Sequence, residues 1–543
     1  MLNLICGIER ADELFLQFLG EIQSIIANSR LGYFLRLSAL SLVMIIVTAT
    51  DNVDQNMLLE YFTLVDIFDT LVEIFISPDV EEDLAFDALF ILIVLVNYRK
   101  NESRNLYLHH LSKLEASGIL IPIAYVIARA FRDYSRDPPV AVENLGVLAR
   151  VTSTIKPWAA SSGLREVKQG ASTFSSPKAC AILLALYEVV HVNSSFCSCC
   201  INKTTAPTKS PVPLQAQMNE LLFRYASKYP EVAGTEDDLF GYLLSKLMEF
   251  CDHLYGNIQE FGLESNAKLS LLILQCFTES DAVNKYLHSK SPHSYELRKS
   301  QEGWWTGKKP PDEDSFYICH ILHLCQKFLV KNLFVPFRAE LYCRCMAVLQ
   351  RILCYQKRLR LRVKFDWTTV WTSLFRLMKF VATPEKFKLP HVPQLCCKLC
   401  QVFNLFITYG DIFLASPSDY DVLYYEIMRS SQIVEGLHEL GYKANNRELL
   451  QYLSNIRSII SHFSGKLDDW TLNHPDKPLS TEIVMTVIKE NYDTLKLTLL
   501  PGLDSFEPYL ENPHEVQFFR GFTRQLVVAF RDTVQVKPYP VNT

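Results

Sequence analysis

The sequence predicts an all-α fold made of stacked helical pairs, and two observations carry this prediction. First, glycine is scarce, because 19 of 543 residues is about half the usual share, which argues against a turn-rich β protein. Second, apolar residues recur at helical spacing along most of the chain, and hydrophobic residues make up 49% of it, enough for a large core. Two short helices cannot bury both apolar faces alone, so each pair needs neighbouring pairs.

The clearest pair lies in residues 395–429. Apolar residues at helical spacing give its first helix one buried face, and we expect Gly410 to end that helix, because glycine adopts the left-handed conformation without steric cost. Pro417 suits the start of the second helix, where Ser418 and Asp421 resemble a capping box. No fixed sequence repeat is visible, so only the pattern repeats, and it fits an armadillo- or HEAT-like helical solenoid.

Similar spacing predicts helices before and after this pair. In chain order, these further helices are expected at residues 14–26, 31–50, 58–76, 84–96, 106–114, 119–134, 179–192, 214–229, 239–255, 267–279, 316–331, 336–355, 367–381, 433–440, 448–463, 480–489, 492–500 and 516–530. Two polar stretches interrupt the series, and their composition predicts flexibility. The expected organisation is N-terminal helical repeats (1–193), a flexible insertion (194–213), middle helical repeats (214–288), a flexible loop (289–315) and a C-terminal helical region (316–543).

Charge, cysteines and hydropathy indicate the compartment. The net charge of −5 gives no basic field of the kind that nucleic acid requires. The first ten residues carry Glu9 and Arg10 and no secretory pattern, so we expect the 15 cysteines to be reduced thiols in the cytosol. The apolar runs 37–49 and 84–96 have about 13 residues each, whereas a membrane span needs about 20. Hydropathy alone would allow a single-pass protein, but we expect fully buried core helices.

Motifs for metal binding and catalysis are weak or missing. Three clusters contain possible metal ligands: Cys197, Cys199 and Cys200; Cys396, Cys397 and Cys400; and Cys319, His320, His323 and Cys325. Zinc sites usually need two spaced pairs of ligands, and no cluster has a partner pair, so we favour packing over metal. The sequence lacks phosphate-binding glycine loops and nucleophile elbows. It therefore predicts a protein without cofactor, metal or enzymatic activity.

One charged stretch allows two interpretations. The basic strip, defined as Lys357, Arg358, Arg360, Arg362 and Lys364, alternates with apolar residues. The favoured interpretation is a solvated edge whose apolar neighbours point inward. The alternative is contact with an acidic partner or anionic lipid, worth about 1 kcal/mol for each basic residue near a bilayer.

A second candidate is the trio Tyr286, Leu287 and His288, which ends a predicted helix just before the loop at 289–315. Such residues at a helix end are usually core and cap. An exposed trio beside a loop would instead resemble a small binding hot spot.

Several longer strings resemble the armadillo-like helical domain-containing protein 3 family. They are LCYQK at 353–357, the helix with Trp367 and Trp371, FITYGD at 406–411, YYEI at 424–427, NYDTL at 491–495, TATDN at 48–52, NYRK at 97–100 and LALYE at 184–188. The resemblance covers nearly the whole chain, and the block 316–530 is similar to the family's formerly uncharacterised C-terminal domain. Known members begin with additional N-terminal helices and have a longer Pro/Thr-rich stretch in place of the insertion at 194–213.

The resemblance implies a non-enzymatic Golgi adaptor. It would bind phosphatidylinositol 4-kinase beta and support phosphatidylinositol 4-phosphate production, Golgi maintenance and secretion. A Golgi Arf guanine-nucleotide exchange factor and an Arf-like small GTPase are further implied partners, with peripheral contact to the Golgi membrane from the cytoplasm. The family's kinase-binding motif Phe-Leu-His falls on Tyr286, Leu287 and His288, where Tyr286 keeps the ring and adds a hydroxyl. Fold analogy alone offers the alternative of an armadillo-type trafficking or nuclear-transport receptor.

Overall fold

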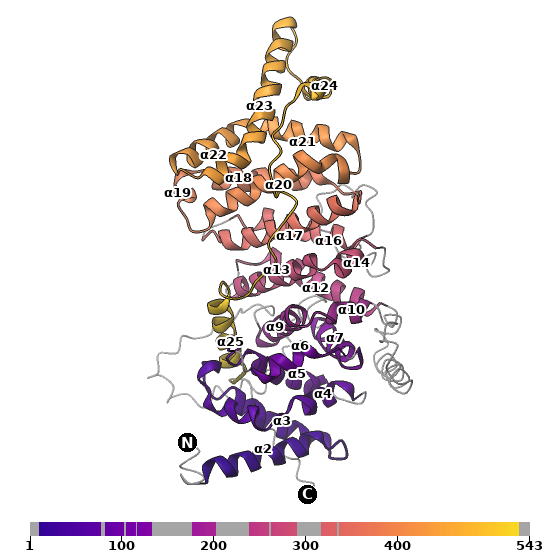
Figure 1. Ribbon diagram of the computed structural model, residues 1–543, viewed down its shortest axis with the longest axis vertical. Coiled ribbons are helices and arrows are strands. Elements are labelled where there is room, and N and C mark those ends of the chain that lie inside the picture. Colours follow the sequence, from indigo (N-terminus) through magenta and orange to yellow (C-terminus); the bar gives the residue numbers. More distant parts are fainter. Residues whose placement is uncertain are drawn as a thin grey trace, which may run out of the picture. The chain divides into compact units, whose positions relative to one another are not determined.

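The computed structural model describes residues 10–531 except 78–81, 103–104, 116, 133–175, 202–237, 260–261, 290–315 and 334–335. All regular elements in this described part are α or 3₁₀ helices (Figure 1), which confirms the all-α prediction. They fall into two compact units. Unit 1 comprises Met1–Phe250, Gln259–Leu269 and Leu510–Thr543, and unit 2 comprises Cys251–Ile258 and Ser270–Tyr509. The expected division of the chain differs from these units, because the last segment belongs to unit 1.

Unit 1 is built around one buried helix. Its helices are α2 (Ala11–Ala27), α3 (Tyr33–Val47), η1 (Val53–Gln55), η2 (Met57–Thr63), α4 (Phe68–Ile76), α5 (Glu82–Asn97), α6 (Leu106–Lys113), α7 (Ser117–Arg132), α9 (Pro177–Val192), α10 (Phe196–Ile201), α25 (Val516–Arg531) and parts of α12 (Leu239–Gly256) and α13 (Leu263–Glu279). Helix α5 packs against α3, α4, α6, α7, α9 and α25. Its residues 84–96 are buried apart from half-buried Asp87, as expected for a core helix.

Helix α3 differs from the prediction of full burial. Leu42 and Ile45 on its outer face are 37% and 41% exposed, whereas Leu40 and Val43 are buried. The prediction is wrong here because α3 packs against α2, α5 and η2 and leaves its outer face uncovered. Within the described residues, no single helix is long and apolar enough to cross a membrane; only α6 and α7 taken together, as a bent pair, meet the length and composition criteria.

The helix expected at residues 58–76 is broken into η2 and α4. The Tyr107 hydroxyl donates to the carbonyl of Phe62 at 2.9 Å and accepts from the backbone N–H of Ile67 at 3.3 Å. This buried hydroxyl satisfies the hydrogen-bonding capacity of both backbone groups at the break. The helix can therefore be interrupted there without leaving these groups unpaired.

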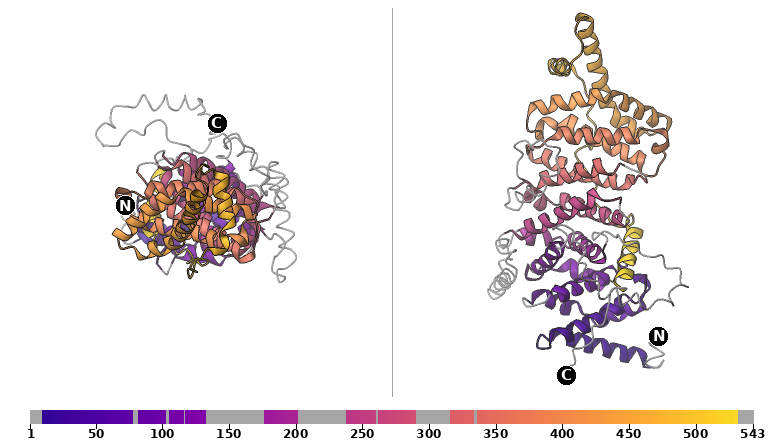
Figure 2. Two further views of the ribbon diagram at one scale, coloured as in Figure 1. Left: turned by 90° about the horizontal axis from the view of Figure 1, so that it is seen from above. Right: turned by 180° about the vertical axis from the view of Figure 1, so that it is seen from behind.

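Unit 2 stacks helices in two rows (Figures 1 and 2). Its further elements are α14 (Asp281–Leu287), α16 (Tyr317–Lys331), α17 (Ala339–Leu359), α18 (Trp367–Val381), α19 (Pro384–Phe387), α20 (Val392–Phe413), α21 (Pro417–Arg429), α22 (Ser431–Lys443), α23 (Arg447–Asn473), α24 (Thr481–Glu490) and η7 (Tyr492–Thr494). Helices α16, α18, α21 and α24 contact one another in succession, and α17, α20 and α23 form the second row. These stacked pairs are the predicted solenoid pattern.

Two details of the α20–α21 corner differ from the sequence-based prediction. Gly410 does not end α20, which continues to Phe413; a Cβ on Gly410 would lie 2.6 Å from Cε2 of Tyr420, so the glycine is needed for close packing. The capping box lies two residues earlier than expected. Ser416 is the N-cap residue, and the Asp419 side chain accepts from its backbone N–H at 2.9 Å. Asp421 instead accepts from the Tyr492 hydroxyl at 2.6 Å.

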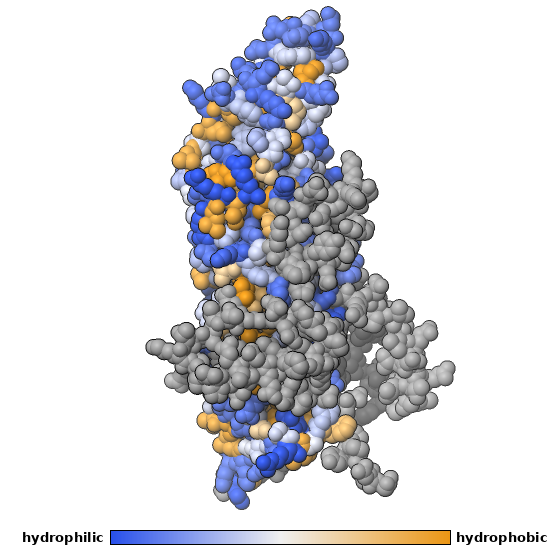
Figure 3. Space-filling model, turned by 90° about the vertical axis from the view of Figure 1, so that its right-hand side faces the viewer, coloured by the Kyte–Doolittle hydropathy of each residue, from blue (hydrophilic) through white to orange (hydrophobic). Residues whose placement is uncertain are grey.

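The end of unit 2 also departs from the prediction. A helix was expected at residues 492–500, but only η7 forms, and residues 495–509 contain no helix. This segment returns across α23, α20 and α17 (Figure 1). Helix α23 projects past the neighbouring helices of unit 2 (Figure 2), and hydrophilic residues predominate at its free end on the face seen in Figure 3.

The flexible insertion expected at 194–213 begins with ordered structure. Helix α10 contains buried Phe196, Cys197 and Cys200, and it packs against α7 and α9. Residues 202–213 and 290–315 lie outside the described residues, so the remaining parts of the two flexible stretches stay predictions.

Candidate partner-binding site

The trio lies at the end of the short helix α14. Ser280 caps this helix, and the Asn284 amide donates to the carbonyl of Thr278 at 2.7 Å, which fixes α14 to the end of α13. Leu287 is fully buried, whereas Tyr286 and His288 are half-buried. The hot-spot interpretation, which needs an exposed trio, is therefore wrong for Leu287, whose side chain is in the core as the usual interpretation has it. Binding through Tyr286 and His288 stays a prediction.

Aromatic packing holds the two half-buried side chains in place. The Tyr286 ring stacks on Tyr317 with centroids 5.7 Å apart, and the His288 ring lies 5.1 Å from Tyr355. Tyr317 is fully buried at the start of α16, and Tyr355 is buried in α17. The two side chains therefore lie on rigid elements, which reduces the entropy cost of a contact with a partner.

His288 is held as a neutral imidazole. Its Nδ1 lies 2.8 Å from the carbonyl oxygen of Asn284, so Nδ1 is the protonated nitrogen and donates there. Its Nε2 accepts from the Gln356 amide at 3.2 Å. Burial lowers the pKa of His288, and the hydrogen bond to Asn284 acts in the opposite direction. The net lowering keeps the ring uncharged at neutral pH.

Part of the basic strip is already neutralised. Lys357 pairs with Asp504 at 2.5 Å, and Arg358 pairs with Asp281. The hydrogen bond to Asp504 raises the pKa of Lys357, and the same bond lowers the pKa of Asp504. Two of the five cations thus have internal carboxylate partners, which reduces the field available to a lipid or an acidic protein.

The rest of the strip alternates as a solvated edge should. Val363 and Phe365 are buried, while Arg362 and Lys364 between and beside them are exposed. Arg362 also donates to the backbone carbonyl of Asp411 at 2.6 Å. The geometry favours the solvated-edge interpretation, and partner contact through the strip stays a prediction.

The cysteine clusters are packed in the core. Cys396, Cys397 and Cys400 are buried in α20, and Cys197 and Cys200 are buried in α10. Burial raises the pKa of Cys197 and that of Cys397 to about 12, so these thiols stay protonated. Within the described chain, no group of three or more His, Cys, Asp or Glu side chains is placed to hold a metal ion. The residues of the third cluster, Cys319, His320, His323 and Cys325, are likewise not placed to do so.

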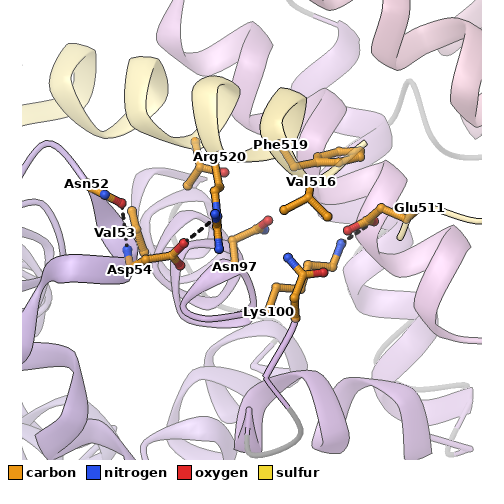
Figure 4. Close-up of a pocket in the computed structure, with 11 residues that line it drawn as sticks. Asn52, Val53, Asp54, Asn97, Lys100, Glu511, Val516, Phe519 and Arg520 are labelled. Carbon is orange, nitrogen blue, oxygen red and sulfur yellow. Dashed lines mark hydrogen bonds and ion pairs between the residues drawn. The ribbon is translucent and has the colours of Figure 1, made fainter. Parts of the chain in front are cut away.

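A buried ionic cluster in unit 1 was missed from the sequence. Lys100 follows α5, and its Nζ lies 2.7 Å from Glu188 of α9. The same Nζ lies 2.6 Å from Glu511 (Figure 4). The Tyr187 hydroxyl also donates to Glu511 at 2.8 Å. Burial raises the pKa of Glu188 against the effect of Lys100, whereas the two carboxylates outweigh burial and raise the pKa of Lys100. The cluster borders a cavity of about 20 Å³, enough for roughly one water molecule.

The ionic cluster holds the C-terminal helix in unit 1. Phe519 of α25 stacks on Tyr187 with centroids 4.6 Å apart, and Phe530 stacks on Phe90 at 3.9 Å. Arg520 pairs with Asp54 at 2.9 Å at the cavity rim (Figure 4). Every charge here has a partner, so the arrangement is suited to packing rather than to acid–base chemistry. Lys100 and Glu188 occur in two strings that carry the family resemblance, which was the available signal.

Comparisons with known proteins agree with this architecture. The family model described as "Armadillo-like helical domain-containing protein 3, C-terminal" matches residues 315–532. The Xenopus laevis protein named armadillo-like helical domain-containing protein 3 is 30% identical over 98% of this chain and 80% of its own length. The human protein of that name is 30% identical over 97% of this chain and 78% of its own length, and the Danio rerio protein is 29% identical over 99% and 80%.

Proposed function

Because this chain belongs to the armadillo-like helical domain-containing protein 3 family, we propose that it is a non-enzymatic Golgi adaptor for phosphatidylinositol 4-kinase beta. In this role it supports phosphatidylinositol 4-phosphate production, Golgi maintenance and secretion. The all-helical stack supports an adaptor, since solenoids present extended surfaces to partners.

One observation carries the assignment of the kinase contact. The family resemblance implies that Tyr286 and His288 correspond to the two ends of the Phe-Leu-His motif. Both side chains are partly accessible and pack against buried rings. A rigid aromatic anchor is the usual centre of a binding hot spot. Leu287 contributes by fixing α14 in the core, since it is fully buried.

The test separates binding from folding by changing the trio one residue at a time. Tyr286→Ala should weaken kinase binding by about 2 kcal/mol, or roughly 30-fold, in titration calorimetry, as hot-spot anchors do. Tyr286→Phe restores the ring of the family motif and should bind at least as tightly as the unaltered chain. Tyr442→Ala is the matched control, because this tyrosine of α22 is 73% exposed and remote in sequence from the trio.

The melting curve decides how a loss of binding is interpreted. Tyr286→Ala should lose about 0.5–1.5 kcal/mol of folding stability, because its ring stacks on Tyr317. Leu287→Ala should lose more, about 2–5 kcal/mol, as a buried truncation does. Unaltered kinase affinity in a folded double variant, Tyr286→Ala with His288→Ala, would overturn the assignment of this contact.

The membrane role is proposed as peripheral. Partners then bring the chain to the Golgi, and the family resemblance suggests an Arf guanine-nucleotide exchange factor and an Arf-like small GTPase. Carbonate extraction of a membrane fraction should release the protein to the supernatant, and retention in the pellet would contradict this proposal. Cellular imaging should show Golgi staining, whereas nuclear-rim staining would favour a transport receptor.

A further inference from the structure

The helix-free segment 495–509 of unit 2 is held against the helices of that unit largely through its main chain. At its start, Asn455 of α23 makes two hydrogen bonds to Thr498: its amide donates to the carbonyl, and its side-chain oxygen accepts from the N–H, both at 2.9 Å. The Asn455 amide also donates to the side-chain oxygen of Asn404 in α20 at 3.1 Å. Asn404 in turn donates to the carbonyl of Tyr452. These bonds hold the Asn455 side chain in the orientation that binds Thr498.

The second half of the segment is held in the same way. The main-chain contacts are Gln350 to the carbonyl of Ser505 at 3.1 Å, Arg351 to the carbonyl of Glu507 at 2.9 Å, and the N–H of Tyr509 to Glu279 at 3.0 Å. Ser505, Glu507 and Tyr509 are two apart, as in an extended chain, where alternate residues face the same side. Residues 501–504 before them form a turn, in which Gly502 has a φ of 72°. Contacts to main-chain groups accept many sequences, so this face recognises extended peptide as such.

Three side chains of the segment add selectivity. Asp504 pairs with Lys357 at 2.5 Å, and the Phe506 ring lies 4.5 Å from the Arg351 guanidinium. Leu503 is fully buried. Leu500 and Tyr509 are also buried, whereas Leu499 is 72% exposed and Leu497 is 38% exposed.

If the segment left, buried polar side chains of the helices would lose their hydrogen-bond partners. Asn455 is 1% exposed and Arg351 is 4% exposed in the occupied state. Removing the segment would leave their polar atoms without these partners, which costs free energy until another main chain replaces it. An empty face of this kind is therefore suited to rebinding an extended peptide.

We propose that the peptide-recognition face, defined as Glu279, Gln350, Arg351, Lys357 and Asn455, binds an extended segment of a partner protein. The segment carries an acidic residue followed two positions later by an aromatic one, to match Lys357 and Arg351. Residues 495–509 occupy the face in cis and compete with that partner. This inference is independent of the kinase contact at Tyr286 and His288, since it uses different residues.

Tethering sets the strength of the competition. A segment joined to its site acts at an effective concentration of about the millimolar range, so a free peptide with the same contacts binds poorly while the internal segment is intact. Weakening the internal segment removes this competitor without changing the face.

The probe is a fluorescent synthetic peptide with the sequence of residues 495–509, titrated against the full chain by anisotropy. The double variant Leu503→Ala with Asp504→Ala weakens the internal segment and should bind the peptide at least about tenfold more tightly than the unaltered chain does. Adding Asn455→Ala to that variant should abolish the gain. A peptide with alanine at the positions of Asp504 and Phe506 should bind more weakly than the native one.

Two results would overturn the proposal: equal affinity in the weakened and unaltered chains when both are folded, or full binding after Asn455→Ala. Hydrogen exchange on the folded double variant, in which the internal segment competes less, gives a second test. Saturating peptide should raise exchange of the amides in residues 495–509, and unchanged exchange with peptide bound would place it elsewhere and reject the face.

Discussion

Replacing Gly410 by alanine tests the packing of the α20–α21 corner. A Cβ at this position would lie 2.6 Å from Cε2 of Tyr420 and 3.0 Å from Cδ1 of Leu414. The Tyr420 ring cannot simply turn away, because its hydroxyl donates to the carbonyl of Ile407 and its ring packs 5.1 Å from Tyr424. The new methyl group would therefore force α20 and α21 apart or displace a buried ring.

Two opposing effects set the magnitude. Alanine in a helix interior is more favourable than glycine by about 1 kcal/mol, whereas an added methyl group in a packed core costs about 1–3 kcal/mol. Contact at 2.6 Å with a fixed ring places the cost at the upper end of that range. We therefore expect Gly410→Ala to destabilise unit 2 by roughly 1–2 kcal/mol.

Gly465→Ala is the matched control. Gly465 is also in a helix, α23, but it is exposed and a Cβ there would meet no atom within 4 Å. This change should stabilise the protein by about 0.5–1 kcal/mol. Thermal melts of the two variants should thus shift in opposite directions. A higher melting temperature for both variants would show that Tyr420 makes room for the new methyl group.

Three further predictions follow from contacts in both units. Lys100→Met leaves Glu188 and Glu511 facing each other without their cation, which should lower the free energy of unfolding by about 3–5 kcal/mol. Limited proteolysis should then release the C-terminal helix at protease concentrations that leave the unaltered chain intact. Equal resistance of the two chains would contradict this prediction. The pKa of His288 is lowered in the folded state, so the unfolded chain takes up the proton first. The free energy of unfolding should therefore fall as pH drops below about 6.5. His288→Gln should flatten this part of a stability–pH curve, and an unchanged slope would show that other groups cause the pH dependence. Ser416→Ala should lose about 1 kcal/mol of stability as an N-cap does, whereas Ser418→Ala, which removes the cap first expected, should lose less; the reverse order in paired melts would refute the observed cap.

Local patterns predicted the helices well where packing follows from sequence spacing. Helix α5 is the best example, since its apolar run is buried on almost every side. The same spacing failed at residues 492–500, because Asn455 binds the backbone of Thr498 and holds it out of a helix. Periodicity describes one segment at a time, so it cannot foresee a side chain from another helix that competes for backbone hydrogen bonds.

The candidate site was predicted only in part for a similar reason. The position of the trio at a helix end was evident, but the burial of Leu287 depends on neighbours that the local sequence does not name. The pairing of Lys100 with Glu511 joins residues 411 positions apart. No local pattern relates such residues, so the ionic cluster became visible only once α25 was placed beside α5 and α9.

The discontinuous path of unit 1 has a consequence for its synthesis on the ribosome. Leu269 leaves the ribosome long before Leu510, because about 240 residues lie between these two parts of the unit. At 5–20 residues per second this is a delay of roughly 12–48 seconds. During that interval Lys100 lacks Glu511, and Phe90 lacks Phe530. The nascent N-terminal helices therefore expose an apolar and charged surface until the last helix arrives, and chaperones have a defined period in which to protect it.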